Sequence, residues 1–222
     1  MKKTQKKASL LKISIFSVLF LLLSAAPLYF IAEKSVRNTM QTQAEMFVQK
    51  IDTRLFTSLT GTRDDLDTPA YKELKSAFIT LKEPHDNIAF LYTAGIRNAA
   101  YRAKTGDIRD EKEVFFYLDS EPEDSYDISL PGDIYDDASR ALYNLFETGE
   151  PYIVGPETDA WGTWVSVLLP IGGDTLETRI AFGVDYHAET YTRTVLWHLF
   201  KLMSIPLLIL CIGLGIYWRK KK

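Results

Sequence analysis

Cysteine is nearly absent from this sequence of 222 residues, which contains only Cys211. An intramolecular disulfide is therefore excluded. Because Cys211 lies inside a long apolar run, we interpret it as a small apolar side chain that packs there. Any domain in this chain must be stabilised by the burial of its own core.

Acidic residues are absent from both ends of the chain. All 29 Asp and Glu residues lie between two uncharged apolar runs, Ile13–Ala32 and Leu202–Trp218. The first run has 20 residues, which at about 1.5 Å per residue matches a hydrocarbon core of about 30 Å. The second extends to about Val195 if the polar tips of His198 and Lys201 reach the headgroups. Both runs are predicted to span a membrane.

Basic residues flank both runs and predict the orientation. Five lysines precede the first run, and Arg219 with three lysines follows the second. Positive residues close to a span stay on the cytoplasmic side, next to anionic membrane lipid, so both termini are expected to be cytoplasmic. The expected order in the plasma (inner) membrane is a tail (1–12), a span (13–32), an extracytoplasmic domain (33–194), a second span (195–218) and a tail (219–222).

The segment 33–194 is acidic, with 16 Lys and Arg against 29 Asp and Glu. This excess of negative charge repels polyanions, so nucleic acid is not an expected partner. At 162 residues, the segment is long enough for one hydrophobic core.

A cleaved signal peptide is the competing interpretation of the N-terminus. Ser24-Ala25-Ala26 follows a basic start and an apolar stretch, as a cleavage site does. However, Pro27 would directly follow the cut, and the apolar character continues to Ile31. We therefore expect the first span to be retained.

Three helices are expected in the segment between the spans. An apolar stripe from Val36 to Leu59 predicts a stalk helix of about 25 residues, whose stripe packs either on its own domain or on a second copy. Pro69, preceded by Asp67 or Thr68 as cap, begins the next helix, and Pro84 ends it. The third is expected from Asp133 to Glu147, with Gly149 at its C-terminal end.

Five short segments have strand character, because they are rich in β-branched and aromatic residues and are bounded by turn residues. They are Ile88–Thr93, Val114–Leu118, Tyr152–Val154, Trp164–Ile171 and Arg179–Asp185. The last two are expected to form a hairpin across Gly172-Gly173-Asp174. The fold class that follows is α+β, with a long N-terminal helix and an antiparallel sheet carrying its helices on one side.

One stretch carries a family resemblance. Gly155-Pro156-Glu157-Thr158-Asp159-Ala160-Trp161-Gly162-Thr163-Trp164-Val165-Ser166, continuing to Pro170-Ile171, and the later Gly183-Val184-Asp185 resemble the PAS-like extracytoplasmic sensor domains of the Cache (PDC) superfamily. Such domains lie between two membrane helices in diguanylate cyclases, histidine kinases and chemoreceptors. The resemblance implies a ligand-binding sensor of this fold.

In that family a cytoplasmic signalling domain follows the second span, whereas here four residues follow Trp218. Output is therefore expected from a separate kinase or cyclase or from a missing continuation, and the resemblance implies a homodimer. Gly172-Gly173-Asp174 is superficially similar to a diguanylate cyclase signature, but Thr175 and Leu176 replace its Glu and Phe. We interpret it as a turn.

Asp185 is the candidate ligand-binding carboxylate. In the last strand, Ala181, Gly183 and Asp185 point to one face and leave room beside a carboxylate, which could receive an amine. The resemblance implies the same role for this Asp, with an amino acid, another amine or a carboxylate as the small extracellular ligand. The alternative is that Asp185 caps a turn or pairs with a stalk residue.

Four aromatic residues are the candidate cavity walls, because ligand cavities are mostly apolar with a few placed polar groups. They are Tyr92, Tyr117, Trp161 and Trp164. The alternative for any one of them is core packing, which is the commoner role of aromatic side chains at strand spacing.

No signal for a metal, a cofactor or a catalytic site is found. His85, His187 and His198 are isolated from one another, and no nucleophile elbow or phosphate-binding loop is present. The acidic run from Asp119 to Asp127 lacks the calcium-loop pattern and is expected to be an exposed loop. An enzyme is therefore not expected.

Two functions remain open. The first is a membrane-anchored sensor that transmits ligand binding to a separate or missing output domain. The second is a non-signalling accessory protein whose Cache-like domain binds a partner protein.

Overall fold

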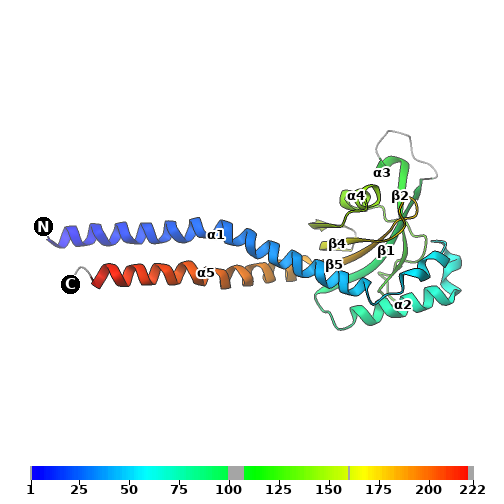
Figure 1. The fold of residues 1–222 in the computed structure, drawn as a ribbon, viewed down its shortest axis with the longest axis horizontal. Coiled ribbons are helices and arrows are strands. Elements are labelled where there is room, and N and C mark those ends of the chain that lie inside the picture. The colour runs from blue at the N-terminus through cyan, green and yellow to red at the C-terminus, as the bar shows by residue number, and fades with distance from the viewer. Residues whose placement is uncertain (1, 100–107, 160, 220–222) are drawn as a thin grey trace. The chain divides into compact units, whose positions relative to one another are not determined.

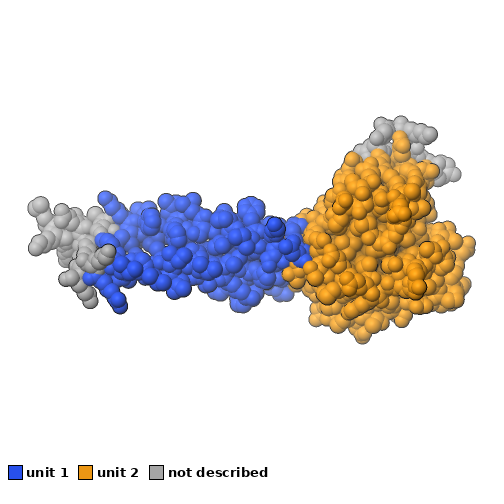
Figure 2. Space-filling view, in the orientation of Figure 1, with its two compact units in different colours: residues 1–38, 192–222 blue, residues 39–191 orange. Residues whose placement is uncertain are grey.

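The computed structural model describes residues 2–99, 108–159 and 161–219. They divide into two compact units, residues 1–38 with 192–222, and residues 39–191 (Figure 2). Each unit is described separately below.

Two long helices form the first unit. They are α1 (Lys2–Val48), whose last turns belong to the second unit, and α5 (Ala188–Arg219). Each is long and apolar enough to cross a membrane and contains one of the two predicted spans. Their apolar side chains, such as Phe16 and Ile209, are largely exposed, as expected of side chains that face lipid.

The second unit is built on a five-stranded antiparallel sheet with the strand order β2-β1-β5-β4-β3 (Figure 1). The strands are β1 (Ile88–Asn98), β2 (Lys112–Asp119), β3 (Tyr152–Thr158), β4 (Thr163–Gly172) and β5 (Ile180–His187). All five predicted strands are confirmed, although several extend further than predicted. The predicted hairpin is also confirmed, since β4 pairs with β5 across a turn in which Gly173 has a φ of 72°.

Helices cover both faces of this sheet, which corrects the expectation that they gather on one side. Phe78 of α2 (Pro69–Lys82) contacts Phe182 of β5. Leu142 of α4 (Arg140–Thr148) belongs instead to the core cluster that contains Ala181. Since neighbouring strand residues point to opposite faces, α2 and α4 lie on opposite sides of β5.

The stalk helix ends earlier than its apolar stripe predicts. α1 stops at Val48, and a separate 3₁₀ helix, η1 (Thr53–Ser58), follows it, with the Asp52 carboxylate accepting a hydrogen bond from the Arg54 N–H. This local cap competes with continued helix. Met40, Ala44, Phe47 and Ile51 of the apolar stripe are buried within the single chain. At these residues the stripe therefore packs on its own domain rather than on a second copy.

The helix boundaries elsewhere are partly confirmed. α2 has the predicted cap, because the Thr68 side chain accepts from the Tyr71 N–H. α4 starts at Arg140 rather than Asp133, since Ile134 bridges to Phe115 as an isolated β-pair and Ser139 caps the helix. Gly149 ends α4 in the left-handed conformation, as predicted. The short helices η2 (Arg63–Asp67) and α3 (Ile108–Glu111) were not predicted.

Candidate ligand-binding site

A cavity lies over the face of β1 and β5 that α4 also covers. It measures about 330 Å³ with its open mouth included, but only about 30 Å³ is open to the centre of a water molecule. The lining residues come from β1, β2, β5, the segment after β2 and the β3–β4 turn: Phe90, Tyr92, Phe116, Asp119, Asp127, Ser129, Tyr135, Asp159, Trp161 and Asp185. As it stands, the cavity holds water or a ligand of very few atoms.

Asp185 forms the floor of this cavity. Its side chain is 4% exposed, and Ser166, directly opposite on β4, hydrogen-bonds the carboxyl group. The Oδ1 atom has no hydrogen-bond partner among the described residues. Burial raises the pKa of Asp185 to about 7, with the Ser166 hydrogen bond opposing the shift and the nearby Asp159 adding to it. A buried carboxylate oxygen without a donor is costly, and a ligand donor would satisfy it.

The space predicted beside Asp185 is partly filled. Gly183 does leave its face of β5 free of a side chain, but the Tyr92 ring lies against it, so that a Cβ at Gly183 would overlap the ring. Tyr92 is buried and also contacts Phe116 and Tyr135 edge-on, with ring centroids 5.7 and 6.1 Å away. Tyr92 therefore lines the cavity and limits its size.

Asp159 organises the rim of the cavity from the turn between β3 and β4. Its Oδ1 atom accepts hydrogen bonds from the backbone N–H groups of Trp161 and Gly162 and from the Trp164 indole N–H, at 2.9 to 3.0 Å. Its Oδ2 atom accepts from the Tyr135 hydroxyl at 3.2 Å. Asp159 thus fixes both tryptophans that the sequence singled out.

The two tryptophans and Tyr117 have different positions. Trp161 is 39% exposed at the mouth of the cavity and contacts Tyr135 and Phe116. Trp164 contacts the Phe90 ring and lines an adjoining hollow that Asp159 and Ser166 also line. Tyr117 is the exception, because it points to the opposite face of β2 and contacts Phe56 and Phe115. Tyr117 therefore lines neither the cavity nor the adjoining hollow, whereas Tyr92, Trp161 and Trp164 each line at least one of them. The part of these side chains in ligand binding stays a prediction.

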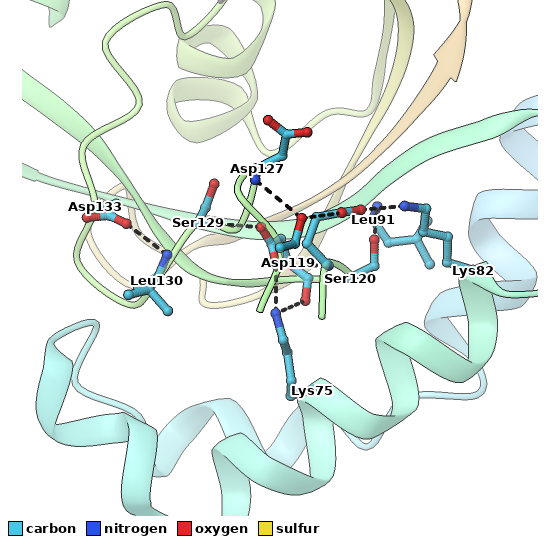
Figure 3. A network of polar contacts seen from close by, with 11 residues as sticks. Lys75, Lys82, Leu91, Asp119, Ser120, Asp127, Ser129, Leu130 and Asp133 are labelled. Carbon is cyan, nitrogen blue, oxygen red and sulfur yellow. Dashed lines mark hydrogen bonds and ion pairs between the residues drawn. The ribbon is translucent and has the colours of Figure 1, made fainter. Parts of the chain in front are cut away.

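The start of the acidic segment is not an exposed loop, which corrects the prediction for Asp119. Asp119 ends β2, and its side chain is 4% exposed. The Nζ atom of Lys75 on α2 donates to its Oδ1 atom at 2.7 Å, and the Ser129 and Glu121 N–H groups donate to its carboxylate (Figure 3). Figure 3 shows Lys75 pointing from its helix to Asp119. Glu123, Asp124 and Asp127 are exposed as predicted.

Several site residues had no signal in the sequence. Asp159 belongs to an Asp-x-x-Gly turn, a pattern that could have identified it as a turn residue, but not as a wall of the cavity. Tyr135 fell in a segment predicted to be helix, and Ser129 fell in no predicted element. Among the described residues, no group of three His, Cys, Asp or Glu side chains is placed to hold a metal ion.

No protein-family model and no curated protein matches the sequence. Among solved structures, the chain is similar to the sensory domain of the Campylobacter jejuni chemoreceptor Tlp3 with isoleucine bound, at 13% identity and a TM-score of 0.47. The same ligand-binding domain in complex with L-valine matches at 12% identity and a TM-score of 0.43, and with L-norvaline at 14% and 0.46. The first match covers 81% of this chain and 65% of the Tlp3 chain.

Proposed function

We propose that the chain is a membrane-anchored sensor, whose domain outside the membrane binds a small ligand at Asp185. The observation that carries this proposal is the buried Asp185 side chain, which lines a cavity and whose Oδ1 atom has no donor among the described residues. The two apolar helices on either side of the domain supply the anchor, and the resemblance of the β3–β5 sequence to Cache sensors supports the same function.

A short path leads from this site to α1. Tyr186 follows Asp185 on β5 and points to the opposite face of the sheet. Its hydroxyl donates to the Met40 carbonyl at 3.2 Å and is 3.1 Å from the Gln43 Oε1 atom. A shift of β5 caused by ligand binding would therefore reach the C-terminal turns of α1, which is continuous with the first apolar run.

The remaining features of the proposal come from the sequence. Basic residues beside the apolar runs favour cytoplasmic termini and an extracytoplasmic sensor domain. Helix movements of this kind are transmitted between paired chains, so the functional unit is a homodimer. The signal is received by a separate cytoplasmic kinase or cyclase, or by a continuation of the chain, and the sensor domain itself is not an enzyme.

Ligand binding can be tested on the full chain in lipid nanodiscs. A screen of small amines, amino acids and carboxylates at millimolar concentration should find a compound that raises the melting temperature by about 2 °C or more at saturation. Asp185→Ala should abolish that shift, whereas Asp64→Ala, at an exposed carboxylate outside the cavity, should preserve it. An equal shift in Asp185→Ala would contradict the proposed site.

A further inference from the structure

The charges around the cavity all have the same sign. Asp119, Asp127, Asp159 and Asp185 line it, and Asp137 and Glu157 line the adjoining hollow, which shares Tyr92, Tyr135 and Asp159 with it. In the part of the chain that the structure describes, no Lys, Arg or His side chain lines either space. The only charged side chains that line these spaces among the described residues are therefore carboxylates.

The nearest lysines are already engaged outside the cavity. Lys75 is buried and donates to Asp119 from the side of α2. Lys82 pairs with Glu121 and lies 5.5 Å from the centre of the Phe90 ring. Neither is available to neutralise a ligand carboxylate, which would be repelled by the surrounding Asp side chains.

Aromatic rings supply most of the remaining wall. Tyr92, Phe116, Tyr135 and Trp161 contact one another around the cavity, with neighbouring ring centroids 4.9 to 6.4 Å apart. Aromatic faces attract organic cations and also accept their methylene groups. The combination of rings and carboxylates suits a cation with a small apolar group.

Taking the proposed sensor function as its basis, we propose that the ligand is a small organic cation, namely a primary amine that carries no carboxylate. Its ammonium group donates to the unpartnered Oδ1 atom of Asp185 at the floor. Its apolar part lies against Tyr92 and Phe116, and Trp161 closes the mouth. An α-amino acid is disfavoured, because the described walls offer its carboxylate no cationic partner.

The small volume of the cavity requires test compounds of only a few heavy atoms. Ethylamine, L-alanine and propionate form a matched set, since ethylamine is alanine without its carboxylate and propionate is alanine without its amine. Three heavy atoms can supply a Kd of about 1 mM at best, so probes should be titrated to about 20 mM. The full chain in nanodiscs is the sample, and its melting temperature and isothermal calorimetry are the readouts.

Ethylamine is expected to bind, L-alanine at least about tenfold more weakly, and propionate not at all. Asp185→Asn should lose ethylamine binding, and Asp64→Asn should retain it, which separates the cavity carboxylate from general surface charge. The amine class is overturned if L-alanine or propionate binds as well as ethylamine, if ethylamine does not bind, or if Asp185→Asn still binds it. The sensor function is judged separately, by whether any small molecule in the wider screen binds the full chain in a way that needs Asp185.

Discussion

Asp185 combines complete burial with a carboxylate oxygen that no described residue satisfies. Ser166 offers one hydrogen bond, and Asp159 adds a second negative charge nearby. The side chain therefore keeps its proton up to about pH 7 when the cavity is empty. The unsatisfied Oδ1 atom of Asp185 lowers the folding stability of the empty chain, and it leaves an acceptor for a hydrogen-bond donor of a ligand.

The unfolding free energy of the chain should depend on pH because of Asp185. Because the pKa of Asp185 is raised to about 7 in the folded state, the folded chain holds a proton that the unfolded chain releases near pH 4. The stability due to Asp185 is thus complete below about pH 4 and is lost as pH rises to about 7, by up to about 4 kcal/mol.

Asp185→Asn isolates this effect from the other carboxylates. The difference in unfolding free energy between the parent chain and Asp185→Asn, measured by urea denaturation, should fall as pH rises from about 4 to about 7. A difference that is constant with pH would show that Asp185 keeps an ordinary pKa.

At the scale of elements, the Lys75–Asp119 pair joins α2 to the end of β2 and to the segment that follows it. Both side chains are nearly fully buried. Burial raises the pKa of Asp119, against the opposing effects of Lys75 and of the Ser129 N–H group. The pair positions Ser129, and with it one wall of the cavity.

Removing one partner of this pair should be costly. Lys75→Met leaves Asp119 buried without its cation and should lower the unfolding free energy by about 3–5 kcal/mol. Lys72→Met provides the control, because Lys72 is on the same helix and pairs with Asp67 at 3.7 Å on the exposed surface; its cost should be at most about 1 kcal/mol. Equal losses in chemical denaturation would contradict the structural role given to Lys75.

At the scale of the whole molecule, two apolar helices flank a strongly acidic segment in the sequence. Together with the basic tails, this distribution predicts one orientation in the membrane. The fully exposed Tyr126 is a suitable reporter for the domain, and the single native cysteine simplifies labelling.

In a Cys211→Ala background, Tyr126→Cys should react with a membrane-impermeant maleimide in cells whose inner membrane is intact. Thr4→Cys, in the N-terminal tail, should react only after that membrane is permeabilised. The opposite pattern would reverse the proposed orientation, and labelling of both in intact inner membranes would exclude a cytoplasmic N-terminus.

Patterns that depend on near neighbours were readable from the sequence. These include the two apolar runs, the five strands, the hairpin at Gly173, the Thr68 cap and the Gly149 helix end. Asp185 and Trp161 both line the cavity, and their role in ligand binding stays a prediction. The end of α1 and the start of α4 were not readable, since a capping side chain at Asp52 and a bridge at Ile134 override the apolar periodicity.

The sequence by itself determined where this protein is apolar, where it is acidic and which segments form strands, because these properties follow from local residue spacing. Only the tertiary structure decided that Tyr92 fills the space over Gly183 and that Tyr117 faces away. It also decided that Asp119 is buried against Lys75, 44 residues away. Such contacts depend on how distant segments meet, and burial then sets the charge state and the exposure of each side chain.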